Sequence, residues 1–138
     1  MVKVSIMLQV NASFEKIWDM ISNVDDDSNY WTETVRIKNL SKNRNGVTRE
    51  VRLSDGRKCQ QKVTLFPKER IHIRYTKGPM IGIKDLMLID KGRMSIIRVQ
   101  INYKLEAGQD KSASVLKELQ SEAEHALHLI KKHAERKP

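Results

Sequence analysis

The stretch VKVSIMLQVNASFEKIWDMISNVDDDSNYW, residues 2–31, decides the fold. Its first nine residues alternate apolar and polar side chains, as in a strand with one buried face. Ser13 is a residue type that caps helices. Apolar residues then recur at helical spacing: Phe14, Ile17, Trp18 and Ile21. The polar segment Asp25–Ser28 predicts a second short helix that delivers Tyr30 and Trp31.

From residue 34 onward the pattern predicts strands joined by tight turns. Asn45-Gly46 and Asp55-Gly56 are hairpin signals, because these residue types tolerate positive φ. Pro67 and Gly78-Pro79 end later strands. The segment Ile81–Asp90 predicts a further strand whose register stays open, and the strand after it has the cleanest alternation in the chain.

A single long amphipathic helix is predicted over residues 112–134. Its apolar stripe consists of Leu116, Leu119, Ala123, Ala126, Leu127, Ile130 and Ala134. The order of all these patterns predicts an α+β fold, in which a curved antiparallel sheet of about six or seven strands wraps around the C-terminal helix. Two short helices follow the first strand, and the arrangement leaves space for a small molecule between sheet and helix.

Composition narrows the class of protein. We expect residues 1–138 to form one domain. Hydrophobic residues make up 39% and charged residues 31%, as in soluble globular proteins. No apolar stretch approaches the roughly 18 residues of a transmembrane helix, and the alternating N-terminus lacks the apolar block of a signal peptide, which predicts a cytoplasmic protein. Cys59 is the only cysteine, which excludes an internal disulfide and a cysteine zinc cluster.

The chain is strongly basic. It has 26 Lys and Arg against 17 Asp and Glu, a formal net charge of +9. Such a balance favours contact with anions: nucleic acid, acidic membrane surfaces or phosphorylated ligands. The alternative is a solvated basic surface without a partner.

The N-terminal motif resembles that of a known superfamily. The run Val10-Asn-Ala-Ser-Phe-Glu-Lys-Ile-Trp18, followed by Ile21-Ser-Asn-Val-Asp25 and by Trp31, is similar to the signature of the polyketide cyclase/dehydrase-type branch of the START-like (SRPBCC) helix-grip superfamily. The resemblance covers nearly the whole chain. It implies an apolar ligand held between the sheet and the last helix. Because pocket linings vary among members, it implies no catalytic residue.

Polar groups on the inward strand faces are candidate ligand contacts. If the apolar faces point at the helix, they also carry Arg49, Cys59, Gln61, Tyr75 and Tyr103, and polar groups on an apolar wall orient ligands. The predicted ligand-binding residues are Trp31, Arg49, Gln61, Tyr75, Met87, Tyr103 and Leu127. The alternative is that Arg49 pairs with a carboxylate near the rim and that the tyrosine hydroxyls reach solvent.

The sequence predicts no catalytic residue, cofactor or metal site. Cys59 has no basic partner in view and fits a small buried apolar residue better than a nucleophile. Tyr75 or Tyr103 could serve as a general acid in a cyclase. His125 and His128 have helical metal-ligand spacings to glutamates, but a second helix would have to supply more ligands. The chain has no glycine-rich phosphate loop and no Gly-x-Ser-x-Gly motif.

The outward strand faces are expected to be basic. They carry Arg36, Lys38, Arg52, Lys58, Lys62, Arg70, His72, Arg74, Arg98 and Lys104, with Glu50 as the only acid at clearly outward positions. Eight of these cations form the predicted anion-binding surface: Arg36, Lys38, Arg52, Lys58, Lys62, Arg74, Arg98 and Lys104. Such a face could follow a phosphate backbone, but it lacks aromatic residues for base stacking.

Three hypotheses follow. The first is a protein that binds an apolar or amphipathic small molecule, such as a lipid, an isoprenoid or a polyketide-like compound. The second is an enzyme of the cyclase/dehydrase type, in which a tyrosine or arginine directs proton transfer. The third is weak contact of the basic sheet face with nucleic acid or an acidic membrane surface.

Overall fold

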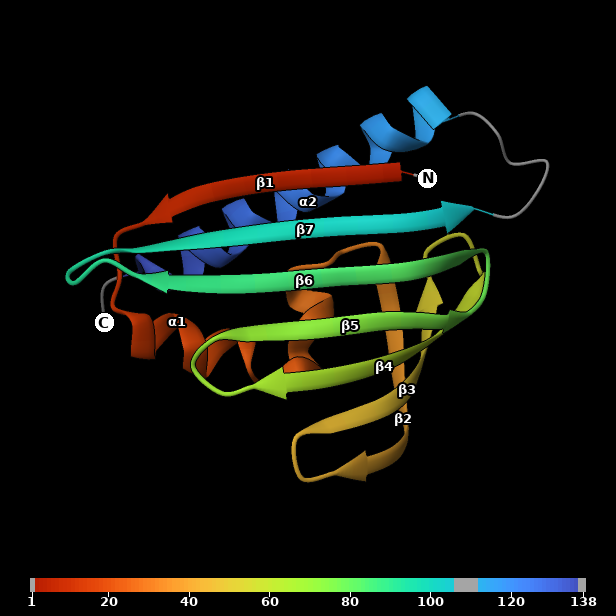
Figure 1. Cartoon of the computed structure of the whole chain (residues 1–138), viewed down its shortest axis with the longest axis horizontal. Coiled ribbons are helices and arrows are strands. Elements are labelled where there is room, and N and C mark those ends of the chain that lie inside the picture. Colours follow the sequence, from red (N-terminus) through yellow and green to blue (C-terminus); the bar gives the residue numbers. More distant parts are fainter. Residues whose placement is uncertain (1, 106–111, 137–138) are drawn as a thin grey trace.

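A computed structural model describes residues 2–105 and 112–136. Seven antiparallel strands form one sheet in the order β1-β7-β6-β5-β4-β3-β2 (Figure 1). The strands are β1 (Val2–Val10), β2 (Thr34–Asn43), β3 (Gly46–Leu53), β4 (Lys58–Phe66), β5 (Arg70–Lys77), β6 (Met80–Asp90) and β7 (Ser95–Leu105). The helices are α1 (Phe14–Ile21), the 3-10 helix η1 (Val24–Asn29) and α2 (Ser112–Ala134).

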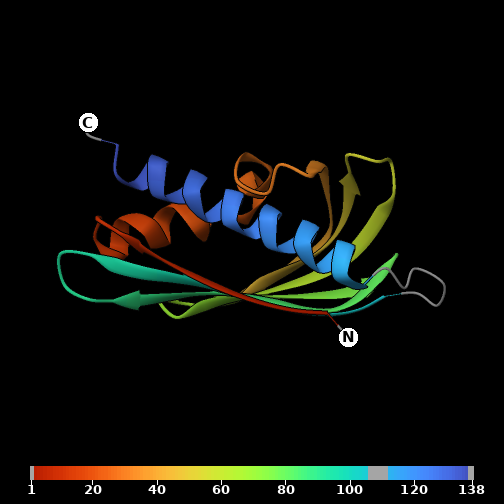
Figure 2. The same cartoon turned by 90° about the horizontal axis from the view of Figure 1, so that it is seen from above.

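The predicted α+β architecture is confirmed. The sheet is curved, α2 runs along its concave side, and α1 and η1 lie on that same side (Figure 2). None of the helices in the described ranges is long and apolar enough to cross a membrane.

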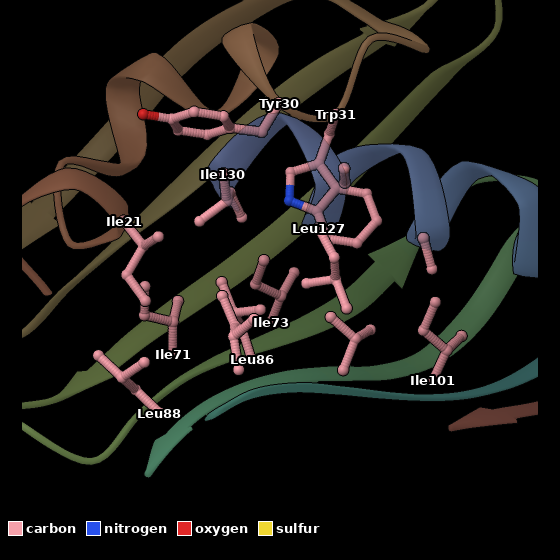
Figure 3. Packing of buried hydrophobic residues seen from close by; sticks show 14 of the residues in the cluster. Ile21, Tyr30, Trp31, Ile71, Ile73, Leu86, Leu88, Ile101, Leu127 and Ile130 are labelled. Atoms are coloured by element: carbon pink, nitrogen blue, oxygen red, sulfur yellow. The ribbon is translucent and has the colours of Figure 1, made fainter. Parts of the chain in front are cut away.

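The two short helices begin where the sequence predicts. Ser13 caps α1, and its hydroxyl accepts a hydrogen bond from the Lys16 backbone N–H at 3.3 Å. Helix η1 then turns the chain, so that the buried residues Tyr30 and Trp31 reach the core from the concave side (Figure 3).

The strand pairing confirms most of the predicted turns and corrects one. Gly56 lies in the β3–β4 turn with a positive φ of 90°. The β2–β3 turn, however, consists of Arg44 and Asn45, one residue earlier than predicted, because Gly46 already pairs with Asn43 and Thr64. A side chain on Gly46 would collide with the carbonyl oxygen of Val63 on the neighbouring strand, so close strand approach explains this glycine.

The core lies between the concave sheet face and α2. Five of the seven predicted stripe residues of α2 are buried: Ala123, Ala126, Leu127, Ile130 and Ala134. Nearer the N-terminus of the helix, Leu119 is half-buried and Leu116 is 37% exposed, which differs from the prediction. The sheet therefore grips the C-terminal half of α2 more tightly than the N-terminal half.

Polar contacts also hold the C-terminal end of α2. The Lys131 ammonium donates to the Gln9 carbonyl oxygen at 3.0 Å, and the Glu135 carboxylate accepts from the Asn11 backbone N–H at 2.7 Å. The Tyr30 ring meets the His133 ring edge-on, with 5.6 Å between centroids. These contacts tie the end of the helix to β1 and to the segments beside it.

Candidate functional site

A partly open cavity of about 140 Å³ lies beneath the N-terminal half of α2, between that helix and the sheet. Its apolar wall includes Trp31, Leu53, Ile101 and Leu119. Its polar and charged lining residues include Glu33, Asp55, Arg57, Tyr75, Lys84, Tyr103, Glu118 and Glu122. The cavity forms because the N-terminal half of α2 packs less closely against the concave face of the sheet than the C-terminal half does.

A glycine arranges the two tyrosines on the sheet wall. Gly82 of β6 pairs with Tyr75 on one side and with Tyr103 on the other, so the three residues form one row across the sheet. Because Gly82 has no side chain, the two rings meet above it, edge to face, with centroids 4.9 Å apart. A Cβ at position 82 would lie 2.8 Å from the Cα of Tyr103. Burial raises the pKa of Tyr103 well above its ordinary value, so its hydroxyl remains a neutral hydrogen-bond group.

Lys84 is the charged residue of the sheet wall. Its side chain lies on the concave face, and the residue is only 5% exposed. The ammonium nitrogen lies 3.5 Å from the centroid of the Trp31 ring and 6.0 Å from that of Tyr75. Among the described residues, Lys84 forms no ion pair with a carboxylate. The ring faces compensate part of the lost hydration of the ammonium.

Three carboxyl groups line the same cavity, and one of them, Glu122, interacts with the charge of Lys84. Glu122 and Glu118 come from α2, and Glu33 comes from the segment between η1 and β2. Burial, together with repulsion from Glu33 and Glu118, raises the pKa of Glu122 to about 7, and the charge of Lys84 opposes part of this rise. Glu122 can therefore hold or release a proton near neutral pH.

Arg49 and Gln61 lie outside the cavity wall and hold η1 against the sheet. The Arg49 guanidinium donates to the Gln61 side-chain oxygen at 2.9 Å, to the Val24 carbonyl oxygen at 2.9 Å and to the Asp27 carboxylate at 2.7 Å. The predicted alternative, in which Arg49 pairs with a carboxylate, describes this geometry. The pair is buried, and it positions the segment that carries Trp31.

The other predicted ligand-binding residues have different surroundings. Trp31, Tyr75 and Tyr103 line the cavity. Leu127 is buried in the core further along α2 (Figure 3). Met87 pairs with Arg70 and Arg98 on the convex face, because the register of β6 places Lys84, Leu86 and Leu88 inward. Met87 therefore differs from the prediction and cannot touch a ligand in this cavity.

Cys59 and the histidines of α2 play no visible part in the cavity. Burial raises the pKa of the Cys59 thiol, which leaves it less reactive at neutral pH. His125 borders a shallow hollow on the surface of α2.

The predicted anion-binding surface lies on the convex face. Arg36, Lys38, Arg52 and Lys58 surround a shallow hollow of about 200 Å³ together with Glu50. Arg36 faces Arg52 across the strands, and Arg52 faces Lys58. Further along, Lys62 faces Arg74, Arg98 pairs with Met7 and Met87, and Lys104 pairs with Ile81.

The convex face also carries an acid on β6, the strand whose register the sequence leaves open. The Asp85 carboxylate lies 2.7 Å from Nδ1 of His72, from which it accepts a hydrogen bond when that nitrogen carries the proton, and 3.6 Å from the Arg70 guanidinium. Glu50 is therefore not the only outward-facing acid.

Lys84 and the three glutamates were not among the predicted site residues. A signal for Lys84 was present, because the turn after Asp90 sets Leu88 opposite the inward Ile97. Counting back by twos from Leu88 brings Leu86 and Lys84 to the concave face. No comparable signal exists for Glu33, whose position depends on how the segment after η1 crosses the sheet.

Comparisons with known proteins identify the type of fold. No protein-family model and no curated protein matches the chain. The solved structures similar to this chain include three that match over nearly their whole length. A START superfamily protein from Mycobacterium smegmatis has 16% identity and a TM-score of 0.79, with 96% of this chain and 97% of that chain covered. The Zhui aromatase/cyclase from Streptomyces sp. R1128 has 12% identity and a TM-score of 0.80, covering 97% and 93%. A protein from Thermus thermophilus has 12% identity and a TM-score of 0.81, covering 96% of both chains. The chain has the START-like helix-grip fold of these structures.

Proposed function

We propose, from this helix-grip fold and the contents of its cavity, that the protein binds a small amphipathic molecule between the sheet and α2. The observation that carries the proposal is the cavity wall, in which the apolar groups Trp31 and Ile101 adjoin the buried ammonium of Lys84. Apolar walls with a few placed polar groups are typical of ligand sites. The similarity to an aromatase/cyclase supports the proposal at the level of the fold.

The volume limits the size of what the cavity can enclose. At about 140 Å³, it is comparable to engineered cavities of about 150 Å³ that bind benzene, and smaller than the roughly 300–1,000 Å³ of sites for drug-sized ligands. A ring-sized part of the ligand would be enclosed, and the rest would extend through the opening. Among the predicted ligand classes, this favours ring-bearing polyketide-like or isoprenoid compounds over lipids with long acyl chains.

The test is native mass spectrometry of the purified protein, followed by organic extraction of any bound compound. A matched pair of variants locates the site. Leu119→Trp adds a ring that fills the cavity, whereas Leu116→Trp adds the same ring to an exposed position of the same helix outside the cavity wall. We expect Leu119→Trp alone to lose the bound compound. Retention by both variants would place the ligand elsewhere and refute the proposal.

A cyclase-type or dehydratase-type enzyme is the second candidate. The observation that favours it is the presence of Glu122, with a pKa of about 7, in the same cavity as the Lys84 ammonium. A base with a pKa near the working pH is efficient in proton transfer, and a fixed cation stabilises an enolate oxygen. Glu122 would take a proton from the carbon next to a carbonyl group, and Lys84 would hold the resulting enolate oxygen.

Acetophenone in deuterated buffer tests this second candidate, with proton NMR of its methyl group as the readout. We expect the protein to accelerate exchange of the methyl protons for deuterium, and Glu122→Gln to remove the acceleration. If exchange with the protein is no faster than in buffer alone, the enzyme candidate is refuted, and the proposal that the protein binds a ligand is unaffected.

Contact with polyanions is the third candidate. It is favoured by the cations that face one another across β2, β3 and β4, since like charges directly opposite destabilise a sheet unless counterions or a partner screen them. Titration with double-stranded DNA and with acidic liposomes at two salt concentrations tests it. Binding that is absent, or that does not weaken with salt, would refute it.

A further inference from the structure

The ammonium of Lys84 has unused hydrogen-bonding capacity. It carries three donors, yet in the part of the chain that the structure describes it forms no ion pair. It lies 3.5 Å from the centroid of the Trp31 ring and 6.0 Å from that of Tyr75. A cation this well buried has lost most of its hydration. An anionic oxygen of a ligand in the cavity would accept hydrogen bonds from the ammonium and neutralise its charge, which the ring faces cannot do.

Most other charged groups around Lys84 are already engaged. Asp27, which lies near enough to interact with Lys84, is paired with Arg49 at 2.7 Å. Asp55 and Arg57 pair with each other at 2.6 Å. Because each of these two pairs is neutral overall, the net charge that a ligand meets is set by the remaining residues of the cavity wall.

The remaining titratable groups of the cavity are three carboxyls and two phenols. Glu118 and Glu122 face the cavity from α2, and Glu33 faces it from the segment before β2. Tyr103, on the sheet wall with Tyr75, is neutral because burial raises its pKa. Glu122 is the carboxyl that changes charge near neutral pH, since its pKa is raised to about 7. Its charge opposes the binding of an anion, and protonation removes that opposition.

We propose, on the basis of the proposed function, that the ligand carries a carboxylate on its ring-sized part, that the Lys84 ammonium binds this carboxylate, and that binding tightens as Glu122 takes up a proton. The site is thus selective for organic acids although three carboxyl groups border it. The protonated Glu122 carboxyl can also donate a hydrogen bond to an oxygen of the ligand.

The sign of the pH dependence follows from two carboxyl groups with different pKa values. A simple aromatic carboxylate, with a pKa of about 4, stays charged from pH 5.5 to 8.5. Over the same range Glu122 changes from mostly protonated to mostly ionised. The repulsion between the two carboxylates therefore exists only at the upper end of the range, and binding is tighter at the lower end.

Three single-ring probes separate charge from ring binding: benzoate, benzyl alcohol and benzylamine. Each is titrated into the protein at pH 5.5 and at pH 8.5, and amide NMR shifts report the dissociation constant. We expect benzoate to bind about tenfold more tightly at pH 5.5 than at pH 8.5, as two charges across a partly hydrated cavity imply. The dissociation constant of benzyl alcohol should change by less than about twofold between the two pH values, because this probe carries no charge.

Two variants and one control assign the effect to residues. Lys84→Met keeps the apolar stem and removes the ammonium, so it should lose the preference for benzoate over benzyl alcohol. Glu122→Gln should bind benzoate at pH 8.5 as tightly as the unmodified protein does at pH 5.5. Glu124→Gln removes the same charge from an exposed position of α2 and should keep the pH dependence.

The outcomes distinguish this inference from the proposed function. Equal binding of benzoate and benzyl alcohol at both pH values would overturn the inference and leave a ring-binding cavity. Tighter binding of benzylamine would also overturn it, and would show that the carboxyl groups set the charge preference. Failure of all three probes to bind would refute the proposed ring-sized site, and this inference with it. Glu122→Gln keeps the test valid if Lys84→Met does not fold.

Discussion

Replacing Glu122 by glutamine should stabilise the protein at alkaline pH and leave its stability nearly unchanged in mild acid. The pKa of Glu122 rises from 4.5 to about 7 on folding, so the native protein binds this proton more tightly than the unfolded chain does. Stability therefore falls as the pH rises from 4.5 to about 7, and the full cost is present above that range. Glutamine has nearly the same shape and no charge, so the variant avoids this cost.

The size of the effect follows from the same change in pKa. For a group fully shielded from water, it corresponds to about 3 kcal/mol. Glu122 is half-buried at the border of a partly open cavity, and solvent screening reduces the figure to about 1–2 kcal/mol. In a domain of this size, that difference raises the melting temperature by about 3–6 °C.

The assay is urea unfolding, followed by circular dichroism, at pH 5 and at pH 8.5. Glu124→Gln is the matched control, because Glu124 is exposed on the same helix and its replacement makes the same change in net charge. We expect Glu122→Gln to raise the free energy of unfolding at pH 8.5 and the control to leave it within about 0.5 kcal/mol. An equal gain at both pH values, or a gain in the control, would show that relief of a buried charge is not the cause.

Three further experiments test other parts of the structure. Asp27→Asn should lower the free energy of unfolding by about 3 kcal/mol, because it leaves the buried Arg49 guanidinium without its ionic partner; a loss below about 0.5 kcal/mol in urea unfolding would contradict the role of this pair. Ile130→Ala should cost about 2–5 kcal/mol by opening a cavity in the core, whereas Leu116→Ala at an exposed position should cost far less, and calorimetry compares the two. The Cys59 thiol should react with iodoacetamide much faster in urea than in the native protein, because burial raises its pKa; equal rates would mean that the thiol is accessible in the native state.

The fold could be predicted because each element is encoded locally. The alternation of β1 and the cap at Ser13 depend only on neighbouring residues, and the stripe of α2 needs only helical periodicity. The turn at Asn45-Gly46 was placed one residue late, because strand pairing through Gly46 decided the position of that turn and local preference did not.

The cavity was harder to predict, because its key residues depend on register and tertiary placement. Strand β6 has apolar side chains on both faces, so alternation alone left open which of Lys84 and Met87 points inward. The inward face of Arg49 was predicted, but its bond to the Val24 carbonyl oxygen depends on the path of η1. Glu122 lies at the edge of the helix stripe, where helical periodicity alone does not reveal that it borders a cavity.

The uneven packing of α2 implies a gradient of local stability along one helix. Its C-terminal half is fixed by Ile130 in the core and by the contacts of Lys131 and Glu135. Its N-terminal half rests over a cavity and exposes Leu116. Backbone amides near residue 119 should therefore exchange with solvent through small local openings, while those near residue 130 wait for global unfolding. We therefore expect solvent and solutes to enter and leave the cavity when the first turns of the helix fray, while the core stays intact.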